Sequence, residues 1–292
     1  MIQPFNYAFS KKITALLVVT LTVMTAFSSC KKNNSSENPQ QGTGAPAPNA
    51  PNSIYGTATD AQGKPLANVK VRAVNPTGSN IFVEGFTNAQ GQYRLQISNI
   101  GGWNIYAWKG TEYKDQHFNI RLANKDEDYN AISTNGGSVK KDFVWKLSGT
   151  IPDRPASPAN GTGYFGASMR FVNDNGLLPK LPAGTKVTVF LVPVAGAKYL
   201  DGTNATTSVI RSFTITGNSW NYYLTDIPGT EYRVTATSEL NGITQQVHLG
   251  PNDYAHPVEW AEFFFDSADA NGSLEGGYMT PNAMPWYMGL KQ

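Results

Sequence analysis

Three histidines are the residues of this sequence that could most readily do chemistry, and they are His117, His248 and His256. His256 and Glu259 have the His-x-x-Glu spacing of a metal-binding pair. A catalytic zinc needs three protein ligands and an open position, and no histidine follows residue 256. We therefore interpret the pair as a coincidence, and we predict no metal ligands, no catalytic residues and no cofactor.

A polar stretch from Asp266 to Glu275 has part of the spacing of a calcium-binding loop. If its glycine takes the turn position, Asp269 and Asn271 fall at ligand positions. The first and last ligand positions then hold Ser267 and Tyr278, where such loops carry an acidic residue and a bidentate glutamate. A polar turn before the C-terminal segment is the favoured interpretation, and calcium binding stays open.

Aromatic residues are the stronger candidates for a binding site. In a strand that buries Ile105 and Ala107, Tyr106 and Trp108 have the opposite phase and should point outward. Two outward rings would form a flat platform for the C–H face of a sugar or for a protein partner. We add Tyr223, outward in a second such strand, as a weaker ligand-binding candidate. The alternative is that the rings are buried against a second domain or the C-terminal segment.

The N-terminal region has the features of an export signal. Lys11 and Lys12 precede Ile13–Phe27, an uncharged run that is short for a membrane span of about 20 residues. The run ends just before Cys30, the only cysteine of the chain. This arrangement resembles the lipobox of bacterial lipoproteins, which implies a signal peptide over residues 1–29 and an acylated Cys30 at the new N-terminus. A lipid anchor of this kind holds a protein stably on a membrane.

The residues that follow predict a tether and a neutral protein. Residues 30–53 are rich in Asn, Ser, Gln, Gly and Pro, and we expect this linker to be disordered. Removing the two lysines of the signal from 23 basic residues leaves 21, against 21 acidic residues, so the mature charge is zero. We therefore predict that nucleic acid is not a partner, because binding to nucleic acid requires clustered positive charge.

From Ile54 onward the sequence predicts an all-β fold. Val69–Val74 and Tyr93–Ile97 alternate with the period of a half-buried strand, and Lys186–Val192 is a continuous apolar run, typical of a strand buried on both faces. An internal repeat pairs Phe86-Thr87 with Phe213-Thr214 and continues through aromatic strands in both halves. We therefore predict two sandwiches, over residues 54–149 and 160–266, followed by a C-terminal tail over 267–292.

The first predicted sandwich resembles a known family. Gly56 and Asp60, then Gly63-Lys-Pro65-Leu66, then Val69-Lys-Val71, and later Thr87 with Gly91-Gln-Tyr93, follow the pattern of carboxypeptidase regulatory-like domains, which are transthyretin-like. The resemblance implies a Greek-key β-sandwich of two sheets. It implies little about activity, because this fold serves as a spacer, an accessory or a binding module.

These observations together predict a non-enzymatic lipoprotein of the cell envelope. Its partners are the membrane, through the lipid anchor, and a carbohydrate ligand at Tyr106 and Trp108. The alternative is a structural spacer or accessory subunit that docks onto another envelope protein. Lys31, rather than aspartate, follows Cys30. By resemblance to bacterial lipoproteins this favours the outer membrane.

Overall fold

The structure is a computed structural model that describes residues 50–78, 81–157, 163–174, 177–217, 219–253, 255–265 and 285–290. These residues belong to one compact unit and form strands, turns and loops, with no helix among them. No helix in this part of the chain is therefore long and apolar enough to cross a membrane. The predicted signal peptide, Cys30 and the Asp266–Glu275 segment lie outside the described residues. The all-β prediction is confirmed.

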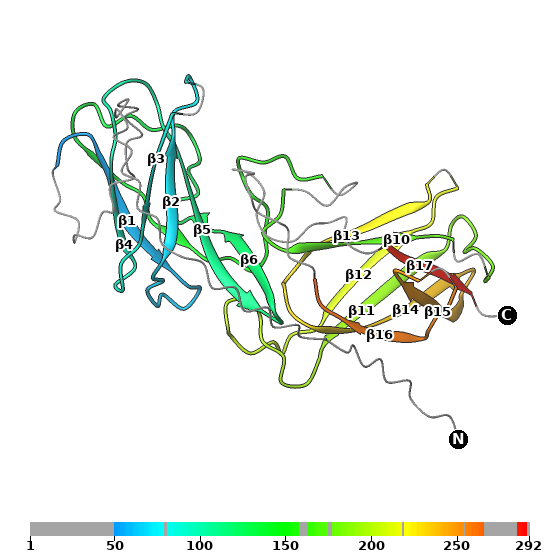
Figure 1. The fold of residues 1–292 in the computed structure, drawn as a ribbon. Coiled ribbons are helices and arrows are strands. Elements are labelled where there is room, and N and C mark those ends of the chain that lie inside the picture. Colours follow the sequence, from blue (N-terminus) through cyan, green and yellow to red (C-terminus); the bar gives the residue numbers. More distant parts are fainter. Residues whose placement is uncertain are drawn as a thin grey trace, which may run out of the picture. The chain divides into compact units, whose positions relative to one another are not determined.

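The first sandwich consists of two sheets, drawn from blue to green in Figure 1. One has the order β4-β1-β9-β7 with β8 also paired to β1, and the other has the order β3-β2-β5-β6. Its strands are β1 (Ser53–Thr59), β2 (Val69–Val74), β3 (Phe82–Phe86), β4 (Gln92–Gln96), β5 (Asn104–Tyr113), β6 (Gln116–Arg121), β7 (Ala123–Asn124), β8 (Ser138–Lys140) and β9 (Phe143–Val144). The first strand thus begins at Ser53, whereas the sequence predicts that this residue belongs to the linker over 30–53.

The predicted alternation of the first sandwich is confirmed by burial. Val69, Val71 and Ala73 of β2 are fully buried, whereas the residues between them are half-exposed. The turns at Asp60 and Asn88 are stabilised in the same way. In each turn the side chain accepts hydrogen bonds from the backbone N–H groups two and four residues later. Such turns pin the register of the strands that they join.

The second sandwich is one continuous sheet that folds over on itself, with the order β12-β11-β14-β15-β17-β10-β13 and with β16 paired to β14. The Phe171 ring on β10 packs 5.7 Å from the Phe213 ring on β12, so the two ends of the sheet face each other across a core. The strands are β10 (Ala167–Val172), β11 (Lys186–Pro193), β12 (Val209–Thr214), β13 (Asn221–Ile227), β14 (Tyr232–Leu240), β15 (Ile243–Pro251), β16 (Trp260–Phe263) and β17 (Pro285–Leu290).

The predicted repeat is confirmed by strand pairing. In the first sandwich β1 pairs with β4, β2 with β3 and β5, and β5 with β6, all antiparallel. In the second, β10 pairs with β13, β11 with β12 and β14, and β14 with β15, also antiparallel. The first strand of each copy is also parallel to a later strand, β9 in one and β17 in the other. The chain therefore contains two tandem sandwiches whose strands are connected in the same order.

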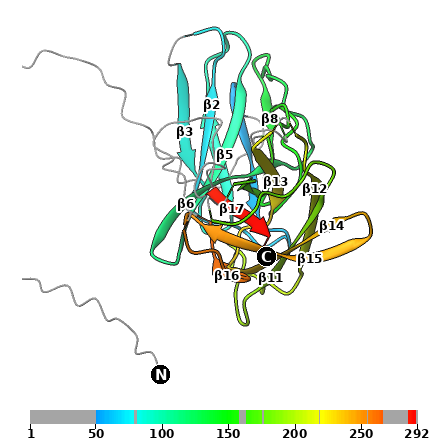
Figure 2. The same ribbon diagram turned by 90° about the vertical axis from the view of Figure 1, so that its right-hand side faces the viewer.

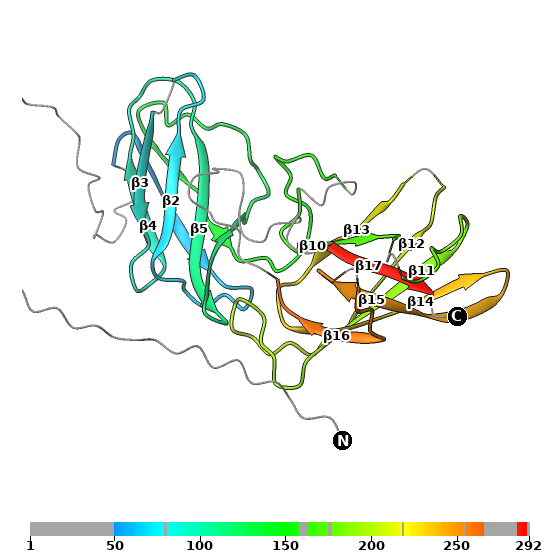
Figure 3. The ribbon, with the colours of Figure 1, turned by 45° about the vertical axis from the view of Figure 1, so that its right-hand side comes forward.

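The C-terminal strand β17 is the main departure from the predicted boundaries. It lies inside the sheet, antiparallel to β15 and parallel to β10 (Figure 3). Trp286 and Met288 point into the core and are almost fully buried. The range 160–266 that we expected for the second sandwich therefore leaves out one of its strands. The reason is physical: a short segment that buries Trp286 and Met288 on one side completes the sheet although it lies far along the chain.

The prediction that β11 is buried on both faces is wrong. Val187, Val189 and Leu191 are fully buried, but the alternate residues face outward, and Val192 is 47% exposed. The strand lies in a sheet that is covered on one side only, so its apolar run includes outward-facing side chains.

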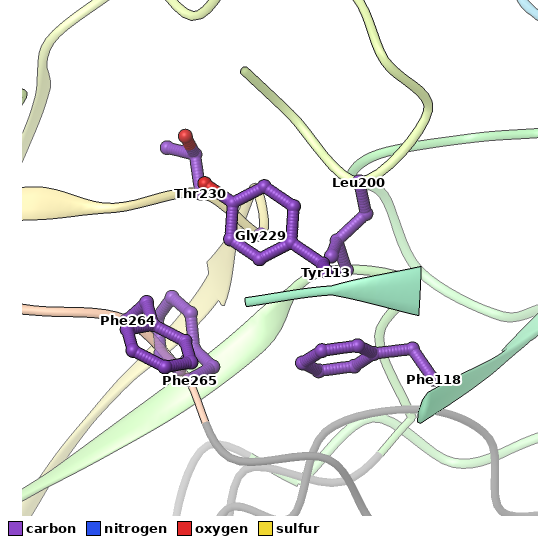
Figure 4. Close-up of a pocket in the computed structure, with 7 residues that line it drawn as sticks. All are labelled: Tyr113, Phe118, Leu200, Gly229, Thr230, Phe264 and Phe265. Carbon is purple, nitrogen blue, oxygen red and sulfur yellow. The ribbon is translucent and has the colours of Figure 1, made fainter. Parts of the chain in front are cut away.

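The hairpin of β5 and β6 contacts the second sandwich. Figure 4 shows the Tyr113 ring among Phe118, Leu200 and Phe264. The Tyr113 ring lies 6.2 Å from the Phe264 ring, and Lys114 Nζ lies 2.7 Å from Glu231 Oε2. Lys114 and Asp115 both have positive φ, as a tight hairpin turn requires. The turn thus brings an aromatic ring and a charge to the contact between the two sandwiches.

Candidate functional site

Trp108 is not on an exposed platform, which corrects the sequence prediction. Its side chain points away from the sandwich core, as expected, yet only 3% of it is exposed. Lys70 on β2 and Arg121 on β6 are its cross-strand neighbours, and Lys70 Nζ lies 5.9 Å from the centre of its ring. Long cationic side chains on both adjacent strands leave no open ring face for a sugar.

Arg121 ties this covered face to the segment between the two sandwiches. Its Nη2 atom donates hydrogen bonds to both carboxylate oxygens of Asp153, each at 2.8 Å. Its guanidinium also lies 5.1 Å from the Tyr106 ring and 5.7 Å from the Tyr129 ring. Tyr106 is half-buried and packs 5.9 Å from Trp108. We therefore interpret the Tyr106 and Trp108 face as part of the structural framework.

The remaining predicted residues are not brought together. Tyr223 is half-buried on β13 of the second sandwich, opposite Arg170 of β10, and so belongs to a different surface from Tyr106. His117 Nδ1 lies 2.6 Å from Glu112 Oε1 at an exposed hairpin. His256 pairs with Asp253, at 2.9 Å. Within the described residues, no group of at least three His, Cys, Asp or Glu could hold a metal.

Trp220 has the same alternation phase as Tyr222 and Leu224, which predicts an inward side chain, but the structure places it on the surface. Tyr222 and Leu224 are buried, but Trp220 is 59% exposed. It precedes β13 rather than lying within it, so the strand alternation does not extend to it. Lys180 Nζ lies 3.9 Å above its ring.

The second sandwich holds an open cleft of about 380 Å³. It is lined by Leu178, His248, Pro257, Val258, Glu259 and Trp260. This volume lies at the lower end of the range for small-molecule sites, about 300–1,000 Å³. The Trp260 side chain is 46% exposed, so an indole ring, a carboxylate and an imidazole occur together in one accessible hollow.

The cleft forms where two strands separate. The first half of β15, up to Val247, pairs with the second half of β14, and the rest of β15 pairs with β17. The first half of β14 pairs instead with β16 (Figure 2). His248 is the first residue of β15 after this divergence, and Trp260 begins β16. A change of partner in the middle of β15 therefore brings these two side chains to one cleft.

Gln246 stabilises the point of divergence. Its side-chain amide donates hydrogen bonds to the backbone oxygens of Ala236, Val247 and Glu259, at 3.0, 3.1 and 3.2 Å. These oxygens lie on β14, on β15 and just before β16. One side chain thus fixes the backbone of Glu259 against both strands. The neighbouring bridge between Leu249 and Val258 holds the same segment along β15.

The polar groups of the cleft could bind hydroxyl groups. His248 is 7% exposed, its Nε2 atom lies 3.7 Å from Glu259 Oε1, and its Nδ1 atom is buried without a hydrogen-bond partner. The Glu259 side chain is 65% exposed and accepts hydrogen bonds freely. Arg233 lies 4.0 Å from the centre of the Trp260 ring and orients the indole by a cation–π contact.

Sequence reasoning missed this cleft. The spacing of His256 and Glu259 lies in the segment that forms the cleft, but the histidine that lies beside Glu259 is His248. His248 is close to Glu259 because the bridge between Leu249 and Val258 holds the two segments together. Trp260 follows Glu259 directly, and an aromatic next to an acidic residue at the start of a strand was the available signal.

Comparisons with known proteins leave the family of this chain open. No protein-family model matches the sequence, and no curated protein matches it. A shaft pilin, spaA, of Lactobacillus rhamnosus GG shares 11% identity, with 84% of this chain and 99% of that chain covered, at a TM-score of 0.20. A DUF3823 family protein of Bacteroides uniformis shares 10% identity, with 73% of this chain and 99% of that chain covered, at a TM-score of 0.20.

A single B repeat of the collagen-binding surface protein of Staphylococcus aureus shares 13% identity, with 74% of this chain and 99% of that chain covered, at a TM-score of 0.18. These values are too low to transfer a site or an activity from any of the three proteins. The assignment of the fold as two β-sandwiches rests on the strand pairing of the chain itself.

Proposed function

We propose that this protein is a non-catalytic binding module of the cell envelope, that its ligand is a carbohydrate, and that the ligand binds in the cleft between β15 and β16. The proposal retains the ligand class that the sequence predicts and moves the site from Tyr106 and Trp108 to the second sandwich. The lipid anchor at Cys30 and the outer-membrane location remain part of the proposal.

One observation carries this function: the exposed indole of Trp260 lies in the same cleft as the carboxylate of Glu259. A pyranose ring has an apolar C–H face and a rim of hydroxyl groups. An indole ring offers area for the face, and an accessible carboxylate accepts hydrogen bonds from the rim. His248, whose Nε2 atom lies 3.7 Å from Glu259 Oε1, adds an imidazole to the wall of the cleft.

The absence of catalysis in this proposal follows from the lining of the cleft. Hydrolysis of a glycosidic bond by the usual mechanism needs a pair of carboxyl groups on opposite sides of the bond. Glu259 is the only acidic residue among the lining residues in the described part of the chain. A single exposed carboxylate suits recognition better than acid–base chemistry.

The test is a glycan array on the purified full chain, followed by calorimetric titration of the glycans that bind. The informative variant is Trp260→Ala. Its matched control is Trp220→Ala, because Trp220 is also exposed and also lies beneath a cation but is outside the cleft. Loss of binding in the first variant and not in the second supports the proposal. Unchanged binding in Trp260→Ala contradicts the assigned site.

The second candidate is a spacer or accessory subunit, and the contact at the β5–β6 hairpin favours it. Tyr113 packs against Phe264, and Lys114 pairs with Glu231, so the sandwiches share both apolar and charged contacts. A structural role would benefit from such a contact, whereas a ligand site does not need it. Failure of every glycan to bind, together with recovery of a defined envelope protein by crosslinking on cells, would favour this candidate.

A further inference from the structure

The outer face of the second sandwich carries a row of side chains that starts at the cleft. Trp260 on β16 lies opposite Thr235 on β14, and Thr235 lies opposite Phe190 on β11. Phe190 in turn lies opposite Ile210 on β12. Residues directly opposite each other in a sheet point to the same face. The neighbours of Phe190 along β11 are fully buried, so this row faces away from the core.

The row is accessible, and its side chains are apolar except for that of Thr235. Trp260 is 46% exposed and Ile210 is 55% exposed, while Phe190 and Thr235 between them are half-exposed. Single exposed apolar side chains are ordinary on a protein surface, but a contiguous series indicates a binding surface. The row spans three strand spacings of about 4.8 Å, or about 14 Å in all, which is longer than one sugar ring.

A second row beside it is made of hydroxyl groups. Thr188 is opposite Thr237 on β14 and opposite Ser212 on β12, and each lies two residues along its strand from a member of the apolar row. The hydroxyl groups of Thr188 and Ser212 are 3.0 Å apart. The face thus presents an apolar strip next to a strip of hydrogen-bonding groups that carry no charge.

We infer that this face continues the cleft into a surface for a neutral glycan chain of several linked rings, so that the ligand is an oligosaccharide or polysaccharide rather than a monosaccharide. This inference rests on the function proposed above. Trp260 belongs both to the cleft and to the row, so a chain with one ring on the indole is directed across Phe190 toward Ile210. Ring faces then lie on the apolar strip, and ring hydroxyl groups meet the Thr188 strip.

The test measures how affinity depends on chain length. The probes are malto-, cello- and chito-oligosaccharides from monosaccharide to hexasaccharide, titrated into the full chain. The variant is Ile210→Asp, which places a charge at the far end of the row. Its matched control is Ile243→Asp, because Ile243 is also an exposed isoleucine, at 64%, and lies outside the row. Neither substitution touches the cleft.

For the series that binds, affinity is expected to rise by about tenfold between the monosaccharide and the tetrasaccharide. Ile210→Asp is expected to remove most of that gain while leaving the monosaccharide affinity unchanged, and Ile243→Asp is expected to change neither. Affinity that is independent of chain length, with no effect of Ile210→Asp, overturns this inference and leaves the proposed cleft intact. Failure of every probe to bind overturns both. A dimer in sedimentation that Ile210→Asp dissociates would assign the face to a second copy instead.

Discussion

His248 Nε2 lies 3.7 Å from Glu259 Oε1, across the point where β15 leaves β14 and β16 replaces it. The two side chains differ sharply in solvent contact, since the imidazole is almost buried and the carboxylate is mostly exposed. The carboxylate is therefore the group that a ligand meets first, and the imidazole forms the wall behind it.

Glu259→Gln is expected to weaken glycan binding by about 1.5 kcal/mol, or roughly tenfold, because a charged acceptor forms stronger hydrogen bonds with sugar hydroxyl groups than an amide does. Calorimetric titration measures the change. Glu239→Gln is the control, since Glu239 is an exposed glutamate on β14 that does not line the cleft. Equal affinities for wild type and Glu259→Gln would remove the carboxylate from the site.

Trp108→Ala is expected to destabilise the fold by about 3–5 kcal/mol, as truncation of a buried tryptophan does. Trp260→Ala should change the free energy of unfolding by no more than about 1 kcal/mol, since its ring is half-exposed and loses chiefly a cation–π contact. Urea unfolding followed by far-UV circular dichroism compares the two. A stable Trp108→Ala variant would mean that this ring is not buried in solution.

Asp153→Ala is expected to cost about 3–5 kcal/mol, because it leaves the buried guanidinium of Arg121 without its carboxylate partner. Glu127→Ala is the contrasting variant. Glu127 pairs with Lys146 at 3.1 Å on the surface, and loss of such an exposed pair should cost less than about 1 kcal/mol. Chemical denaturation of both variants provides the measurement. Equal small losses would show that Asp153 does not hold Arg121.

The stability of the first sandwich is expected to fall at alkaline pH. Burial raises the pKa of Tyr93 well above the ordinary value, and the nearby carboxylates of Asp142 and Asp126 raise this pKa further. The unfolded chain then releases the tyrosine proton near pH 10, whereas the folded chain keeps it. The contribution of protonated Tyr93 to the free energy of unfolding is therefore fully present below about pH 10. It is lost as the pH rises from about 10 toward the pKa of Tyr93 in the folded protein.

Tyr93→Phe isolates this contribution. Its phenol donates a hydrogen bond to the backbone oxygen of Lys141, at 2.7 Å, so the variant should lose about 1 kcal/mol at neutral pH. Between pH 9 and pH 11 its free energy of unfolding should decline less steeply than that of the wild type. Parallel declines would contradict the raised pKa of the folded tyrosine. Denaturant titrations at several pH values measure both slopes.

The sequence predicts the repeating framework better than the site, for a physical reason. Alternation along a single strand, as in β2, and turn chemistry, as at Asp60 and Asn88, are local properties. Burial of Trp108 depends instead on Lys70 and Arg121 in adjacent strands, and the outer face of β11 is exposed because no second layer covers it. Local periodicity contains no information on which elements cover a face.

The cleft was beyond prediction for a related reason. It arises because β15 exchanges β14 for β17 at Val247, and β17 comes from residues 285–290. No spacing within a short window relates His248 to Trp260 or to Trp286. A search for aromatic residues beside carboxylates would have included Trp260, but it could not have ranked this residue above the other tryptophans.

The position of β17 has a consequence for how the second sandwich is made. Of the described strands, β17 is the last to be synthesised, yet β10 and β15 are both paired to it. Until residues 285–290 arrive, both strands present open edges, and such edges favour pairing with other chains. The sheet of the second sandwich therefore cannot be completed before residues 285–290 have been synthesised. A chain truncated before Pro285 should aggregate, even though every residue of the cleft is present in it.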